Sequence, residues 1–147
     1  MSKSTFVYVI YIAAPLEKVW RSLTDGEMTR QYWGHDNVSD WKPGSSWEHR
    51  RSDGSNRLDI VGEVVECTPP KRLVMTWAAP ADIADKTKRS RVTLDLEPVN
   101  DMIRLTATHE DLDAGSDMLR GISNGWPRVL SSLKSFLETG KPLNIFS

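Results

Sequence analysis

Three side chains with binding chemistry alternate along one short segment of the chain. Trp47, His49 and Arg51 occupy every second position of residues 46–51, so a β-strand would place them on one face. An indole offers a flat apolar surface, an imidazole exchanges a proton near neutral pH, and a guanidinium pairs with a carboxylate. If this face points inward, we expect His49 and Arg51 to hold the anionic or polar head of a ligand. The alternative is that the alternation has the opposite phase, or that Arg51 lies at the strand end in water.

A second histidine can reach the same space. His109 ends the alternating segment 103–109, and we expect its side chain at the rim of a shared cavity. Catalysis here would need one acid–base pair, formed by His49 or His109 with Glu66 or Glu110. No other catalytic residue is assigned, because the sequence holds no nucleophile elbow, no phosphate-binding glycine loop and no zinc-protease motif.

The remaining polar candidates are interpreted as structural. We expect His35 and Asp36 to form a surface pair, and the histidines at positions 35, 49 and 109 lack the spacing of metal ligands. The single cysteine, Cys67, is expected to pack as a small hydrophobic residue, and it has no partner for a disulfide within the chain. The sequence therefore predicts neither a metal nor a cofactor.

Tryptophan is unusually frequent, with six indoles beside three tyrosines and three phenylalanines. Three of the indoles fall on apolar faces or at strand ends and are expected in the core: Trp20, Trp77 and Trp126. The other three lie near the predicted junction of helices and sheet, where they would line a pocket mouth and stack on a flat ligand: Trp33, Trp41 and Trp47.

The hydrophobic spacing predicts the elements that must position these side chains. Period-two patterns indicate strands, and steps of three and four indicate helices. Strands are predicted over 5–13, 46–51, 58–67, 72–77, 91–97 and 103–109, short helices over 15–23 and 27–32, and a long helix from Asp117 to the cap at Gly140. Gly62 indicates a bend or bulge, and Pro127 a kink or a break in the long helix. Residues 141–147 are expected to be a C-terminal tail.

Composition excludes several classes of protein. The chain has 147 residues and a formal net charge of -1, which gives no electrostatic reason to bind nucleic acid or an anionic membrane. No apolar run is long enough to span a bilayer, and the N-terminal segment alternates like a strand, so we expect a cytoplasmic protein. The length predicts one domain over residues 1–140.

These elements predict an α+β fold. An antiparallel sheet of about six or seven strands must cover its apolar face, and only the C-terminal helix is long enough to do so. A curved sheet that grips one long helix leaves a space between sheet, long helix and short helices. Such a space is where a small apolar ligand would sit.

The residues at the joints of this fold resemble a known family, the bacterial proteins similar to the C-terminal domain of the activator of the Hsp-90 ATPase. These belong to the START-like (SRPBCC, helix-grip) superfamily. The resemblance covers about residues 5–140 and rests on these segments, in chain order: Ile12-Ala13-Ala14-Pro15 with Val19-Trp20, Trp33-Gly34, Pro43-Gly44, Thr68-Pro69-Pro70-Lys71-Arg72-Leu73-Val74-Met75-Thr76-Trp77, Thr108-His109-Glu110, Asn124-Gly125-Trp126, Leu130, Leu133 and Leu137-Glu138-Thr139-Gly140. It implies the helix-grip fold, in a superfamily that hosts lipid carriers, hormone receptors and polyketide cyclases.

We therefore expect the protein to bind a small, largely hydrophobic or aromatic molecule between the sheet and the C-terminal helix. The alternatives are a cyclase- or hydrolase-like enzyme acting on such a ligand, and a co-chaperone-type protein-interaction module with a protein partner or as a homodimer. An open, tryptophan-lined cavity would favour ligand binding, whereas a solid core would exclude it. The expected ligand-binding residues are Trp33, Trp47, His49, Arg51, Met75, His109 and Trp126.

Overall fold

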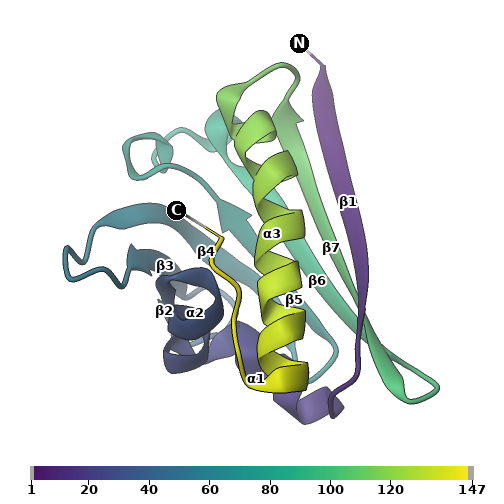
Figure 1. Cartoon of the computed structure of the whole chain (residues 1–147). Helices are drawn as coiled ribbons and strands as arrows, with labels where there is room; N and C mark the ends of the chain where they lie inside the picture. Colours follow the sequence, from purple (N-terminus) through teal and green to yellow (C-terminus); the bar gives the residue numbers. More distant parts are fainter. Residues whose placement is uncertain (1, 146–147) are drawn as a thin grey trace.

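A computed structural model describes residues 2–145 and places one long helix across a seven-stranded antiparallel sheet (Figure 1). The strands lie in the order β1-β7-β6-β5-β4-β3-β2, so β1 and β2 form the two edges. The elements are β1 (Lys3–Ile12), α1 (Leu16–Thr24), α2 (Gly26–Trp33), β2 (His35–Ser39), β3 (Ser46–Arg51), β4 (Leu58–Thr68), β5 (Arg72–Trp77), β6 (Ser90–Val99), β7 (Met102–Asp113) and α3 (Asp117–Thr139). The predicted α+β helix-grip fold is confirmed.

The long helix α3 packs because its apolar residues recur every three or four positions. Ser116 caps its first turn by accepting a hydrogen bond from the Leu119 N–H, and Gly140 ends it with φ +82. Pro127 lies inside α3, and the assigned helix continues through it from Asp117 to Thr139. The alternative that Pro127 marks a break is therefore wrong.

The sequence analysis missed strand β2, which follows α2 directly. Gly34 ends α2 in the left-handed region at φ 72, and the chain then pairs His35 to Ser39 with β3. This strand has five residues and no apolar alternation, so the periodicity gave no signal for it. Its inward positions are filled by the polar side chains of His35 and Asn37, which are both buried.

The tail predicted at residues 141–147 folds back on α3 as far as the structure describes it. In Figure 1 the yellow segment after α3 turns and runs beside that helix, between α2 and α3. Ile145 packs against the hydrophobic core. Residues 146–147 of the predicted tail lie outside the described residues.

No helix in the described range 2–145 is long and apolar enough to cross a membrane.

Gly62 in β4 is the point where the backbone passes closest to a large side chain. The Trp47 indole is fully buried, and its Nε1–H donates to the Thr76 carbonyl at 2.8 Å. A Cβ on Gly62 would lie 1.9 Å from the Thr76 oxygen and 2.3 Å from Trp47 Nε1. The glycine is therefore required by a close approach rather than by its own dihedral angles. The register shifts of β4 lie on either side of it, at Asp59 against β3 and between Val64 and Glu66 against β5.

We predict that Gly62→Ala lowers the free energy of unfolding by about 3 kcal/mol or more, because the added methyl must break the Trp47–Thr76 hydrogen bond and part the strands. Urea denaturation followed by circular dichroism measures the change. Gly121→Ala is the control, since a Cβ at this α3 position meets nothing within 4 Å. That variant should gain about 0.5 to 1 kcal/mol from helix propensity. A loss below 1 kcal/mol in Gly62→Ala would contradict the steric argument.

Candidate functional site

Six ring side chains form a buried aromatic–histidine cluster between the sheet and α3: Trp33, Trp47, Trp77, Trp126, His49 and His109. Trp77 lies at the centre and contacts all five other rings, with centroid distances from 5.3 Å to His109 up to 6.4 Å to Trp33. The rings come from α2, β3, β5, β7 and α3. The side chains of this chain therefore occupy much of the space where a ligand cavity was expected.

His109 is held in one tautomer by a chain of hydrogen bonds. The Trp126 Nε1–H points at His109 Nδ1 at 3.1 Å, so Nδ1 must accept and Nε2 must carry the proton. The Nε2–H then donates to Ser90 Oγ at 2.8 Å, and the Ser90 hydroxyl donates to the Trp77 carbonyl at 3.0 Å. Burial lowers the pKa of His109 to about 3. This histidine is neutral and fully hydrogen-bonded at neutral pH.

His49 is buried in the same way and stacks on His35. Its Nδ1 bonds to Asn37 Oδ1 at 2.5 Å, and its ring lies parallel to the His35 ring at 3.9 Å between centroids. Burial, together with the nearby His35, holds the pKa of His49 well below its usual range, with Asp59 acting in the opposite direction. His35 in turn bonds through Nε2 to Asp59 at 2.9 Å and through Nδ1 to the Trp33 carbonyl at 3.1 Å.

Asp59 connects this histidine pair to the surface. Its carboxylate accepts from Arg51 Nε at 2.7 Å and pairs with Arg57 at 3.4 Å. Partial burial works against the charged form of Asp59, but the hydrogen bonds from Arg51 and His35 outweigh it and lower its pKa. A cavity of about 660 Å³ opens at this point, and its lining residues are Gly34, His35, Arg51, Ser52, Asp53 and Asp59.

The predicted face of β3 is confirmed for two of its three residues. Trp47 and His49 point inward and are buried. Arg51 lies on the same face, opposite the buried His35 of β2, but it is the last residue of β3. The Arg51 side chain is 42% exposed and lies at the strand end, as the alternative reading had it. It is one of the residues that line the cavity.

The prediction that His35 and Asp36 form a surface pair is wrong. His35 is buried and bonds to Asp59, whereas Asp36 points to the other face and pairs with Arg30 at 2.8 Å. The pair separates because consecutive residues of a strand face opposite sides. His35 lies next to the cavity that sequence reasoning did not locate.

The acid–base pairs considered from the sequence do not form among the described residues. His49 and His109 bond to Asn37, Ser90 and Trp126 instead. The described residues also contain no group of three or more His, Cys, Asp or Glu side chains that would hold a metal ion. The one cysteine, Cys67, is half-buried in β4, and burial raises the pKa of its thiol.

The other candidates divide as follows. The core positions predicted for Trp20, Trp77 and Trp126 are confirmed by their burial. Trp33 is buried in contact with His49 at 4.7 Å, while Trp41 is only half-buried against the core. Met75 is buried two residues before Trp77 on the same face of β5.

Trp77, assigned from the sequence to packing alone, carries an unused hydrogen-bond donor. Its Nε1 is buried and has no hydrogen-bond partner within residues 2–145. Buried polar groups are rarely left in this state, because an unmade hydrogen bond costs about 1 to 3 kcal/mol. Sequence reasoning also missed Asn37 and Asp59; the only available signal was that polar residues at inward strand positions need partners nearby.

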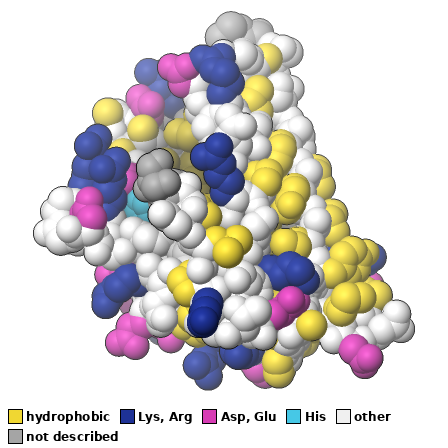
Figure 2. All heavy atoms as spheres, in the orientation of Figure 1, with side chains coloured by type: hydrophobic (Ala, Val, Ile, Leu, Met, Phe, Trp, Pro, Cys, Tyr) yellow, Lys and Arg dark blue, Asp and Glu magenta, His cyan; other side chains and the backbone are white. Residues whose placement is uncertain are grey.

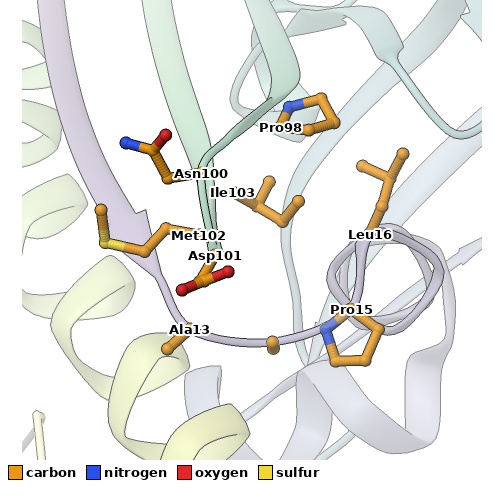
Figure 3. Close-up of a pocket in the computed structure, with 9 residues that line it drawn as sticks. Ala13, Pro15, Leu16, Pro98, Asn100, Asp101, Met102 and Ile103 are labelled. Carbon is orange, nitrogen blue, oxygen red and sulfur yellow. The ribbon is translucent and has the colours of Figure 1, made fainter.

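A second cavity, of about 510 Å³, lies at the far end of the molecule between the β1–α1 connection and the β6–β7 turn. Figure 3 shows its side chains, among which only Asp101 is charged. None of the buried histidines or tryptophans lines it. The cavity at Arg51 is therefore the better candidate site.

The buried histidines predict acid sensitivity. Between about pH 6.5 and pH 3 the unfolded chain binds a proton at position 109 that the folded protein does not, so stability falls as the pH falls through this window. From pH 7 to pH 5 we expect the free energy of unfolding to fall by up to about 1.4 kcal/mol per pH unit for each such histidine. Urea titrations at several pH values measure this slope.

His109→Asn is the matched variant, because the amide oxygen can accept from Trp126 but does not titrate. We expect it to be less stable at pH 7 and to show a shallower pH slope than the parent. Equal slopes in the two proteins would contradict the assignment of a strongly lowered pKa to His109.

Comparison with known proteins places these features in a family. A search among curated proteins finds no match. Among solved structures, the chain superposes on the Aha1 dimer from Colwellia psychrerythraea with TM-score 0.77 at 23% identity, covering 94% of this chain and 98% of that one. On an HSP90 activator from Plasmodium falciparum it superposes with TM-score 0.74 at 25% identity, covering 90% of this chain and 95% of that one. On CalU16 from Micromonospora echinospora it superposes with TM-score 0.73 at 23% identity, covering 95% of this chain and 76% of that one.

The sequence itself gives the assignment. The family model described as activator of Hsp90 ATPase homolog 1-like protein matches residues 13–138, a range that runs from the end of β1 to the last turn of α3. It includes β2 to β7 and every ring of the aromatic–histidine cluster. This chain belongs to the family of activator of Hsp90 ATPase homolog 1-like proteins.

Proposed function

We propose that the protein binds a small molecule that has a flat apolar body and an anionic head. The observation that carries the proposal is the cavity at Arg51, whose lining has charged side chains and also His35, the ring that stacks on His49 of the aromatic–histidine cluster. Its volume of about 660 Å³ lies in the range of small-molecule sites, about 300 to 1,000 Å³.

Arg51 is the proposed contact for the anionic head. Its Nε is used by Asp59, and its two terminal nitrogens have no hydrogen-bond partner in the part of the chain that the structure describes. A guanidinium held at one nitrogen keeps a fixed plane and presents the others as a fork, which matches a carboxylate or a sulfonate. Asp59 therefore orients Arg51 rather than neutralising all of its donors.

The aromatic–histidine cluster is the proposed contact for the apolar body. Indole and neutral imidazole faces attract a flat, weakly polar ring by dispersion and edge-to-face contacts. The unused Nε1–H of Trp77 adds a condition, because a ligand that reaches the centre must offer an acceptor there. The lowered pKa values of His49 and His109 keep both rings uncharged, so the cluster favours contact with an apolar ligand group. Catalysis is not part of the proposal.

We predict that Arg51→Ala weakens binding of 8-anilino-1-naphthalenesulfonate, a flat aromatic anion used here as the probe, by about fivefold, because a partly exposed charged hydrogen bond is lost. Isothermal titration at pH 7 measures the dissociation constant, and a thermal melt checks that the fold is intact. Arg57→Ala is the matched control, since Arg57 also pairs with Asp59 but does not line the cavity. Equal effects of the two substitutions, or none, would remove Arg51 from the site.

A second candidate function is protein contact through β1, with a second copy of the chain as the partner. β1 is an edge strand whose outward face carries Val7, Val9 and Tyr11, which are 54%, 45% and 38% exposed. Between Ser4 and Ala13 it holds no charged residue and no proline, the features that usually protect a free edge. Figure 2, seen from the α3 side, shows further hydrophobic side chains along the β1 side of the molecule; the outward face of β1 is turned away in this view. The Colwellia relative, described as a dimer, supports this candidate.

We predict that the protein forms a dimer that Val9→Lys weakens by about tenfold or more, because antiparallel pairing of two β1 strands would bring the introduced like charges of the two copies close together on one face. Sedimentation equilibrium measures the association constant. Val38→Lys is the control, since Val38 is equally exposed but lies on β2, at the opposite edge. A protein that stays monomeric at millimolar concentration, or equal weakening by both substitutions, would exclude the β1 interface.

A further inference from the structure

The segment after α3 is fastened to the helix by serine side chains. Ser132 Oγ accepts from the Leu143 N–H at 3.0 Å and lies 3.3 Å from the Leu143 carbonyl, to which it donates. One turn further along, Ser135 Oγ donates to the Lys141 carbonyl at 2.7 Å. Ser132 is fully buried, although serine is usually exposed. The serine hydroxyls of α3 thus supply hydrogen-bond partners to the backbone of residues 141–143, which belongs to no helix or strand.

The far end of the segment packs loosely. Leu143 is 49% exposed, and Ile145 is only partly buried against the core. A space of about 500 Å³ remains between residues 143–145 and the α3 residues Pro127, Arg128 and Ser131. A few hydrogen bonds near one end and incomplete packing at the other make the segment separable from α3 without disturbing the sheet.

The segment lies against α3, and in the view of Figure 1 it passes between α2 and α3. Ring contacts close the α2–α3 seam from within, between Trp33 and Trp126 at 5.4 Å and between Tyr32 and Phe136 at 6.2 Å. The cluster rings that belong to the sheet are fixed by the strand ladders, whereas Trp33 and Trp126 sit on two helices that need only side-chain contacts to stay together. The seam is therefore the side from which the cluster can open.

We propose that residues 141–145 form a C-terminal strap that holds the α2–α3 seam closed and must detach before the body of a ligand enters the aromatic–histidine cluster. This inference rests on the proposed function, because it assigns the strap to access to that same site. The strap lies beyond the family match, which ends at residue 138, so it is a property of this chain rather than of the matched region. Ser132 is its main anchor, and Leu143 the residue it holds.

The test compares a chain that ends at Gly140, the variant Ser132→Ala and the parent. Stopped-flow mixing with 8-anilino-1-naphthalenesulfonate should show association and dissociation rates about tenfold faster in the truncated chain, because the lost hydrogen bonds and apolar contacts are worth a factor of that order. Ser132→Ala should change both rates in the same direction by less. Ser123→Ala is the matched control, since its hydroxyl bonds within α3 to the Leu119 carbonyl and does not touch the strap.

Acrylamide quenching of tryptophan fluorescence tests the strap without a ligand. The truncated chain should be quenched more strongly than the parent, with a cooperative melt showing that it is folded. Faster probe kinetics in both altered chains with stronger quenching support the strap. Unchanged rates and unchanged quenching in a folded truncated chain overturn it. If the parent does not bind the probe, the proposed function fails, and the quenching result alone decides whether the strap covers the cluster.

Discussion

The indole N–H of Trp47 reaches across Gly62 to the carbonyl of Thr76, and the placement of the buried rings depends on this contact. It fixes β3 against β5 over the intervening strand, so that Trp47 and Trp77 meet at 5.5 Å. From Trp77 the contacts spread to α2, β7 and α3. A side chain at position 62 would move the first ring of this series and every ring that packs on it.

The polar groups inside the cluster are arranged so that most of their hydrogen bonds are made by the protein. His109 uses both ring nitrogens, and Ser90 relays to the Trp77 carbonyl. His35 uses both of its nitrogens on Asp59 and the Trp33 carbonyl. Against this background the Nε1–H of Trp77 and the terminal nitrogens of Arg51, which find no partner among residues 2–145, differ from their surroundings, and for this reason the proposal places the two ends of a ligand there.

Periodicity in the sequence was sufficient for most of the fold. The alternation in β6 and β7 and the three-and-four spacing in α3 come from residues that are buried on one side only, so burial can be read from residue type. β2 was not predicted because polar side chains fill its inward positions. The alternation in β3 left its phase open, and burial shows that Trp47 and His49 face inward. Arg51 lies on the same face but ends the strand, and its exposure there depends on how far the neighbouring strands extend, which one segment's own pattern does not encode. His35 was misplaced for a similar reason, since its partner Asp59 lies two strands away.

The crowding of indoles around Trp77 gives the protein an optical property of its own. Transition dipoles of rings held 5 to 6 Å apart couple, so we expect the four clustered tryptophans to contribute strongly to the near-ultraviolet circular dichroism of this chain. Two imidazoles that stay neutral at pH 7 also lie against these indoles. Tryptophan emission should therefore respond to any change in the packing of α2 and α3 on the sheet.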